Sequence, residues 1–130
     1  MADTIPTYLS DMITIYHNPR CSKSREGLAL AEQFASQNGQ TLKVVEYQKT
    51  PLDLEQLKSL HRQLGGSVRD MVRANEEEYG ALNLGQADDE ALLRAVAAQP
   101  KLLQRPIVEH RGRAVIGRPT ERLSEFLQSF

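Results

Sequence analysis

The chain has 130 residues, of which 40% are hydrophobic and 25% charged, and its formal net charge is −1. This composition indicates a globular protein with one domain and a real core, and it argues against nucleic-acid binding through a basic surface. A single cysteine cannot form an internal disulfide, and no segment approaches the ~18 apolar residues of a membrane span. Residues 1–11 lack the basic start and apolar run of a signal peptide, so we expect a cytoplasmic protein. We expect those residues to be an N-terminal extension and 12–130 to form a single domain.

The first predicted elements are a strand and a helix on either side of the cysteine. The β-rich run 12–16 predicts the first strand. Apolar side chains recur at helical spacing over 28–35 and predict a helix, with Ser22 or Ser24 serving its N-terminus. Gly27 lies inside this helical pattern, where glycine is unfavourable, which suggests close packing at that position.

A second strand and helix follow. Residues 42–47 predict a strand, and Asp53 with Gln56 three residues later forms a capping box that starts a helix ending at Gly65-Gly66. Two strand–helix pairs at this spacing imply parallel strands joined by a crossover helix.

The second half of the chain predicts a helical insertion and then a hairpin. Residues 67–100 have helical patterns without a strand, and we expect them to pack beside the main sheet. Runs 106–110 and 113–116 flank Arg111-Gly112 and predict a β-hairpin. Thr120 is expected to cap a last helix with Leu123, Phe126, Leu127 and Phe130 on one face. The predicted fold is α/β, with a thioredoxin-like core of order β-α-β-α, helical insertion, β-β-α.

The single cysteine, Cys21, lies in the polar stretch HNPRCSKSR at the loop-to-helix junction. The first turn of a helix presents unpaired N–H groups and partial positive charge, which favour a thiolate. The alternative is a small buried hydrophobe, the common state of a free cysteine. The polar neighbours from Pro19 to Glu26 favour a reactive thiol instead.

The same helix start also binds oxyanions, so an anionic substrate is the natural partner of this thiol. Such a substrate needs further cations, and Arg73, Arg105 and Arg118 are the candidates. Arg105 precedes Pro106 at the start of the third strand, where a proline of this fold is often cis and lies beside the active cysteine. The alternative for any one of these arginines is that it is a solvated surface side chain without a role in binding. It is weaker for Arg105, because the following proline constrains its backbone.

Four motifs together resemble a known family, over nearly the whole chain from Met12 onward. IYHNPRCSKSR, SVRDMVR, KLLQRPIV and IGRP resemble the arsenate reductases that depend on glutathione and glutaredoxin. The resemblance implies that Cys21 is the nucleophile and that the three arginines bind the oxyanion. It also implies supporting roles for His17, Ser24 and Arg25. Ser22-Lys23 departs from the Gly-Thr of the best-known members and is similar to a subgroup called arsenate-reductase-related.

The resemblance implies a reaction as well. The thiol forms an adduct with arsenate, glutathione resolves it because the chain has no second cysteine, and glutaredoxin then splits the mixed disulfide. Arsenite is the implied product. Glutathione is thus an expected co-substrate, with no bound cofactor, no metal site, and neither nucleic acid nor membrane as a partner.

Three alternatives stay open at this point. The same thiol chemistry on a non-arsenate substrate would give the same motifs. A regulator of the Spx type, which binds RNA polymerase, shares the fold but typically carries C-x-x-C and lacks GRP near its end, whereas this chain has C-x-x-S and Gly117-Arg118-Pro119. A plain glutaredoxin needs neither the three arginines nor the insertion.

Overall fold

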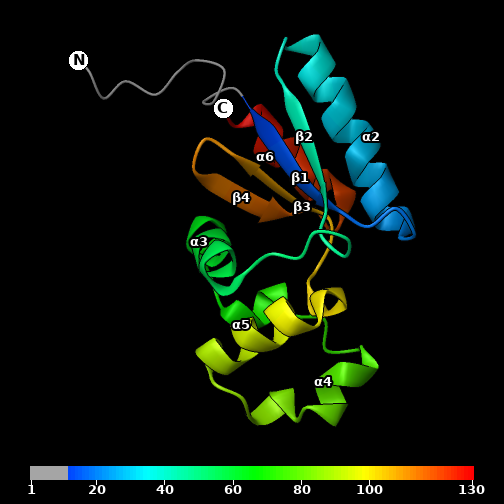
Figure 1. The fold of residues 1–130 in the computed structure, drawn as a ribbon. Helices are drawn as coiled ribbons and strands as arrows, with labels where there is room; N and C mark the ends of the chain where they lie inside the picture. The colour runs from blue at the N-terminus through cyan, green and yellow to red at the C-terminus, as the bar shows by residue number, and fades with distance from the viewer. Residues whose placement is uncertain (1–11) are drawn as a thin grey trace, which may run out of the picture. The chain divides into compact units, whose positions relative to one another are not determined.

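A computed structural model describes residues 12–130, which form two compact units (Figure 1). The first unit comprises the described residues up to Val45 together with Arg105–Phe130, and the second comprises Glu46–Gln104. The expected extension at residues 1–11 lies outside the described residues. The expectation of one domain over 12–130 stays a prediction.

A mixed four-stranded sheet organises the first unit. Its order is β2-β1-β3-β4. The strands are β1 (Ile13–His17), β2 (Leu42–Glu46), β3 (Ile107–His110) and β4 (Arg113–Ile116). β1 pairs antiparallel with β3, which pairs antiparallel with β4. β1 and β2 run in the same direction and are joined by a helix, as predicted (Figure 1).

The predicted hairpin is present, and its turn explains its sequence. Arg111 has φ 50° and Gly112 has φ 77°, so both turn residues are in the left-handed region. Two-residue hairpin turns of this kind match the twist of the flanking strands. The turn therefore sets the register in which His110 pairs with Arg113 and Ile107 with Ile116.

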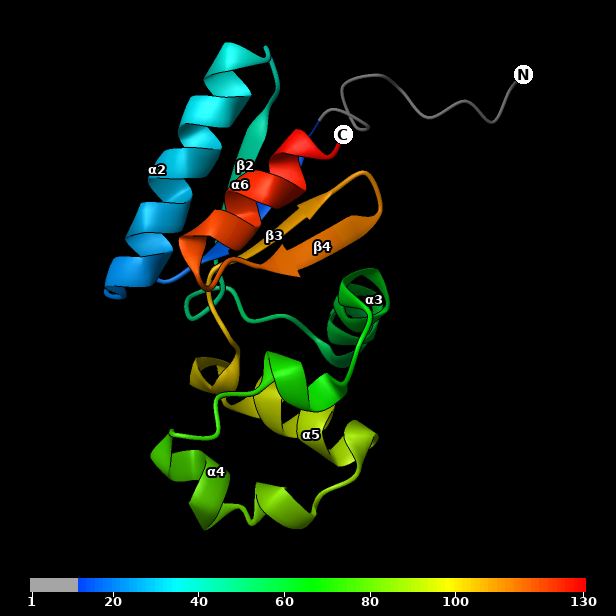
Figure 2. The same cartoon turned by 180° about the vertical axis from the view of Figure 1, so that it is seen from behind.

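Two helices cover one face of this sheet, α2 (Ser22–Gln37) and α6 (Thr120–Gln128) (Figure 2). α2 contacts β1 and α6, and α6 also contacts β4. Between the helices and the sheet lies a buried apolar cluster of Ile13, Ile15, Ala31, Ala35, Val108, Leu123 and Leu127. Their burial is the main stabilising term of this unit.

Three predicted helix features differ from the structure. Neither Ser22 nor Ser24 caps α2, because Cys21 itself is the N-cap and its side chain makes no capping hydrogen bond. Thr120 is the first residue of α6 rather than its cap, because Pro119 supplies the extended N-cap residue. Phe130 lies beyond the end of α6 and is 41% exposed, so it is not part of the buried face.

The second unit is helical and includes residues 67–100, the expected helical insertion. It also includes the helix that follows Asp53, which was expected in the β-α-β-α part of the core. Its elements are α3 (Leu54–Leu64), η1 (Val68–Met71), α4 (Glu77–Ala81), η2 (Leu84–Gln86), α5 (Asp89–Ala98) and η3 (Pro100–Leu102), where η marks a 3₁₀ helix. The capping box of Asp53 and Gln56 is confirmed, and Gly65 ends α3 with φ 68°. α5 contacts α3, η1 and η3, and it buries Leu92, Leu93 and Val96.

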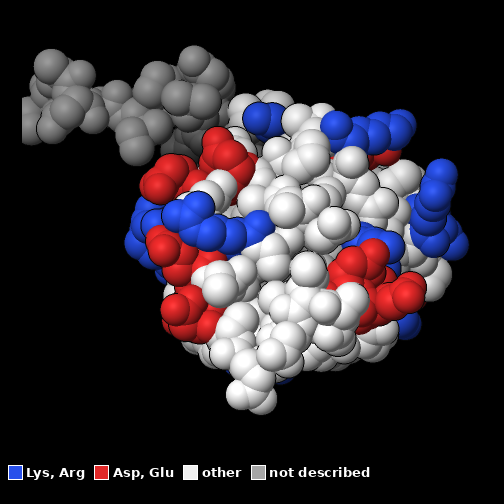
Figure 3. Space-filling model, turned by 60° about the horizontal axis from the view of Figure 1, so that its bottom comes forward, with Lys and Arg blue, Asp and Glu red and all other residues white. Residues whose placement is uncertain are grey.

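Acidic and basic side chains lie beside one another in mixed groups on the face seen in Figure 3. This agrees with the near-zero net charge of the whole chain. No helix within residues 12–130 is long and apolar enough to cross a membrane.

Candidate active site

The cysteine loop positions the sulfur at the N-terminus of α2. Cys21 is the N-cap residue in an extended conformation, and its carbonyl accepts the first helical hydrogen bond from Arg25 N–H at 2.9 Å. Its own N–H donates to the Asn18 carbonyl at 3.0 Å, which closes the preceding turn. The thiol is partly exposed. It therefore lies in the positive field of the unpaired N–H groups while remaining open to a reactant.

Ser24 fixes the cysteine loop through buried hydrogen bonds. Its side chain is fully buried, and its Oγ accepts the Asn18 N–H at 2.9 Å. The same oxygen lies 2.8 Å from Nδ1 of His17, which is also buried. Buried polar groups that are paired in this way fix the loop's geometry. His17 and Ser24 are thus brought together, in an arrangement that shapes the cysteine loop.

Asn18 is a member of this site that the sequence analysis missed. It is 7% exposed, and its Oδ1 accepts the N–H of Arg20 at 3.0 Å. The signal was present in the Asn-Pro pair, since an asparagine side chain readily accepts the N–H two residues later and so initiates a turn.

Two of the three predicted arginines lie beside the thiol. Arg118 Nη1 is 3.9 Å from Cys21 Sγ and 3.4 Å from the carbonyl oxygen of Arg105. The Arg105 guanidinium also interacts with the thiol. Arg105-Pro106 and Arg118-Pro119 are both cis peptide bonds. The ring of Pro106 packs closely against Gly27 of α2, so it helps to seat the helix start against the third strand.

These neighbours alter the acidity of the thiol. Burial by itself raises the pKa of Cys21, but three surroundings act in the opposite direction. They are the backbone hydrogen bond from Ser24, the Arg105 guanidinium and the backbone hydrogen bond from Lys23. The net result is a pKa below that of an ordinary cysteine, so the thiolate is more populated near neutral pH.

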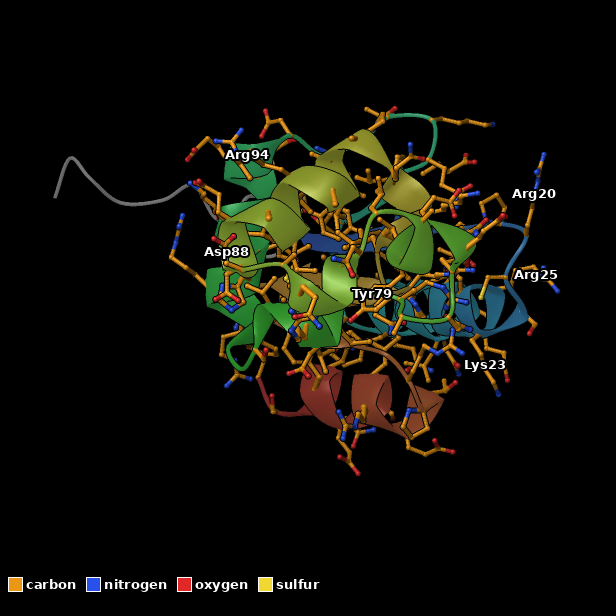
Figure 4. The ribbon with its side chains drawn as sticks, turned by 90° about the horizontal axis from the view of Figure 1, so that it is seen from below. Arg20, Lys23, Arg25, Tyr79, Asp88 and Arg94 are labelled. Carbon is orange, nitrogen blue, oxygen red and sulfur yellow. The ribbon has the colours of Figure 1, made fainter. Side chains whose placement is uncertain are left out.

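Three further cations surround the start of α2. Figure 4 shows Arg20, Lys23 and Arg25 projecting outward from this end of the first unit. Arg25 Nη1 donates to the Pro19 carbonyl at 2.9 Å, so this predicted supporting residue braces the loop. Lys23 pairs with Glu26 at 3.4 Å on the exposed side of the helix.

Arg73, the third predicted arginine, belongs to the second unit. Its N–H donates to the Leu102 carbonyl at 2.7 Å, and its Nε lies 3.3 Å from Glu76 Oε1. Its membership of one anion site with Arg105 and Arg118 stays a prediction.

The first unit thus brings together a partly exposed thiol of lowered pKa, the N–H groups of a helix start and two guanidinium groups. This arrangement suits nucleophilic attack by sulfur on a small oxyanion held by the same donors. Within the described part of the chain, no cluster of three or more His, Cys, Asp or Glu side chains is arranged to hold a metal ion.

The chain is similar to known proteins over most of its length. The model of the ArsC family matches residues 16–126. The chain is 46% identical over 118 residues to an arsenate reductase of Neisseria meningitidis, covering 88% of this chain and 97% of that one. It is 43% identical over 122 residues to the uncharacterized protein YfgD of Escherichia coli, covering 92% and 99%. Among solved structures, an arsenate reductase from Vibrio cholerae superposes with a TM-score of 0.80 at 46% identity, covering 89% of this chain and 98% of that one.

Proposed function

Because the chain belongs to the ArsC family, we propose that it reduces arsenate to arsenite with Cys21 as the nucleophile. The observation that carries the proposal is the placement of Cys21 at the N-terminus of α2 beside Arg105 and Arg118, with a lowered pKa. An oxyanion on these donors places an electrophilic centre next to the thiolate. His17, Ser24 and Arg25 support the geometry of the loop.

The first step joins sulfur to arsenic. The Cys21 thiolate attacks the arsenic of arsenate, one oxygen leaves as water after protonation, and an S–As bond forms with arsenic still at +5. The guanidinium groups stabilise the negative charge of the bound oxyanion.

The second step carries the reduction. Glutathione thiolate attacks the sulfur of Cys21, and the electron pair of the S–As bond passes to arsenic, which leaves at +3 as arsenite. The two sulfurs, each oxidised by one electron, remain as a mixed disulfide. The thiolate of glutaredoxin then attacks the glutathione sulfur and releases Cys21 as a thiolate. Glutathione is thus a co-substrate, and no bound cofactor takes part.

The absence of a second cysteine makes an external thiol necessary. The loop is Cys21-Ser22-Lys23-Ser24, and the chain contains one cysteine, so no resolving cysteine exists within it. A steady supply of reduced glutathione is typical of the cytoplasm, where we place the reaction.

The experiment that tests the proposal measures whether glutathione becomes attached to Cys21 in a mixed disulfide. The protein is incubated with glutathione in the presence and absence of arsenate, without glutaredoxin, and its intact mass is measured. The mixed disulfide should form mainly with arsenate and disappear when glutaredoxin is added. A Cys21→Ser variant should form none. Equal disulfide without arsenate would contradict the proposal and favour the same thiol chemistry on a non-arsenate substrate.

A turnover assay tests the arginines. Arg73→Ala, Arg105→Ala and Arg118→Ala should each weaken arsenate-dependent NADPH consumption in a coupled system with glutathione, glutathione reductase and glutaredoxin. Thermal unfolding should change little. Lysine should substitute poorly because it lacks the planar fork of donors. Full activity in all three alanine variants would show that the oxyanion site is misassigned.

A further inference from the structure

Backbone hydrogen bonds fix the position of Arg73. Its N–H donates to the Leu102 carbonyl at 2.7 Å. The two preceding residues are paired as well, since Val72 bridges to Leu103 and the Gln104 N–H donates to the Met71 carbonyl at 2.8 Å. This short antiparallel pairing fixes the direction in which the Arg73 side chain leaves the backbone.

One carboxylate contacts the Arg73 guanidinium. Arg73 Nε lies 3.3 Å from Glu76 Oε1, with the two side chains only 13% and 23% exposed. The chain turns back on itself here, since the Glu76 N–H points to the Arg73 carbonyl at 3.4 Å. A charged pair with so little exposure holds its geometry better than a surface pair does.

The terminal nitrogens of Arg73 are left available. Within residues 12–130, neither Nη1 nor Nη2 donates a hydrogen bond to another side chain or carbonyl, and both retain contact with solvent. A guanidinium has separate edges of donors in a rigid plane. With Glu76 on the Nε side, the edge formed by the two Nη nitrogens is the one open to an external anion.

We propose that Glu76 is a positioning residue for oxyanion binding: it holds Arg73 through Nε so that the two terminal nitrogens face the anion. The inference rests on the proposed function, in which Arg73 binds the oxyanion. It opposes the simpler electrostatic expectation, in which a carboxylate beside the arginine only repels the substrate. The positioning role predicts that removal of Glu76 weakens arsenate binding, whereas simple repulsion predicts that it strengthens arsenate binding.

The test measures the affinity for inorganic arsenate in a Cys21→Ser parent, which binds without reacting. Nuclear magnetic resonance titration gives the dissociation constant. Glu76→Ala should weaken arsenate binding by about fivefold or more, because the guanidinium loses its orientation. Glu76→Gln keeps an oxygen that accepts from Nε, so its dissociation constant should stay within about twofold of the parent's. In protein with Cys21 intact, the alanine change should raise KM and leave kcat nearly unchanged.

Glu78→Ala is the matched control. Glu78 pairs with Lys101 rather than with an arginine, so this change removes the same charge from the same stretch without freeing Arg73. It should leave arsenate affinity unchanged. In an Arg73→Ala background, Glu76→Ala should have no further effect, since a positioning residue acts only through its partner. If Glu76→Ala lowers the unfolding temperature markedly, Glu76→Asp, whose carboxylate is one methylene shorter, should still weaken binding.

The outcomes separate this inference from the function on which it rests. Unchanged or tighter binding by Glu76→Ala would overturn the positioning role alone, and so would an equal effect of Glu78→Ala. Absence of arsenate binding by the Cys21→Ser parent, together with absence of turnover by the unmodified protein, would overturn the proposed function and this inference with it.

Discussion

The acidity of Cys21 is decided by a few residues around one sulfur atom. Burial raises the pKa of the thiol, whereas the Ser24 backbone N–H and the Arg105 guanidinium lower it, and the lowering prevails. Below the resulting pKa the thiol is protonated and loses nucleophilicity; above it the thiolate reacts at a constant rate.

We predict that the alkylation rate of Cys21 plotted against pH has a midpoint below the pKa of an ordinary cysteine, measured in parallel on a cysteine-containing peptide. Arg105→Met should move the midpoint upward, because the guanidinium no longer favours the thiolate. Arg122→Met removes the same charge from the exposed side of α6 and should leave the midpoint in place. A midpoint at or above the ordinary value in the unmodified protein would contradict the assignment.

Gly27 is the second residue whose environment sets a clear expectation. A Cβ at this position would lie 2.6 Å from Pro106 Cγ and 3.3 Å from Pro106 Cβ. Alanine is favoured over glycine within a helix by about 1 kcal/mol, but the overlap with a buried proline ring costs more. The close packing suggested by the sequence at Gly27 is confirmed.

We therefore predict that Gly27→Ala lowers the free energy of unfolding by about 1–2 kcal/mol, measured by chemical denaturation. Gly80→Ala is the control, since nothing lies within 4 Å of its would-be Cβ in α4. That change should raise the free energy of unfolding by a few tenths to about 1 kcal/mol. Equal effects of the two substitutions would show that Pro106 does not restrict position 27.

Among the elements, the segment from α4 to the start of α5 depends on one side chain of η1. Arg69 donates to the Tyr79 hydroxyl at 3.0 Å and to the Leu84 and Ala87 carbonyls at 3.1 and 2.6 Å. Figure 4 shows Tyr79 and Asp88 in this part of the second unit. Because α4 has five residues and no buried side chain, it has little stability of its own.

We predict that Arg69→Met increases amide hydrogen exchange over residues 79–87 by about tenfold, since each lost hydrogen bond is worth about 1 kcal/mol. Exchange in α2 should not change. Arg94→Met is the control, because the Arg94 side chain is 64% exposed on α5 and its ion pair with Glu90 is 3.9 Å long. Unchanged exchange after the Arg69 substitution would mean that the segment is held by its other contacts.

For the whole molecule, the question is whether the two units unfold together. The second unit interrupts the first between Val45 and Arg105, and a chain segment of about 60 residues is marginal as an independent domain. If residues 12–130 form a single domain, as expected, the two units should unfold together in one cooperative transition.

We predict that calorimetric unfolding shows a single peak whose calorimetric and van't Hoff enthalpies agree. Gly27→Ala changes a residue of the first unit. It should lower the unfolding temperature of α5 in the second unit by the same amount as the unfolding temperature of α2, both measured by amide hydrogen exchange. Two resolved transitions, or a shift confined to α2, would establish two independent domains.

The sequence by itself predicted most of the helices and strands and marked Cys21 as the candidate nucleophile, whose chemistry stays a prediction. Local signals act over a few residues, so the capping box at Asp53, the turn at Arg111-Gly112 and the helix start after Cys21 could all be predicted before any tertiary contact was known. The order of these elements likewise determined the fold class, and the motifs around Cys21 pointed to the family.

Only the tertiary structure decided how the loop is held and which partner each charge has. The pairing of Ser24 with His17 and Asn18 depends on a buried hydroxyl that local spacing had suggested as a helix cap. The approach of Arg118 to Cys21 joins residues 97 positions apart. The pairing of Arg73 with Glu76 is close in sequence, yet its small exposure comes from packing around it. Side-chain direction and burial are set by contacts between distant segments, so residue spacing alone could not specify them.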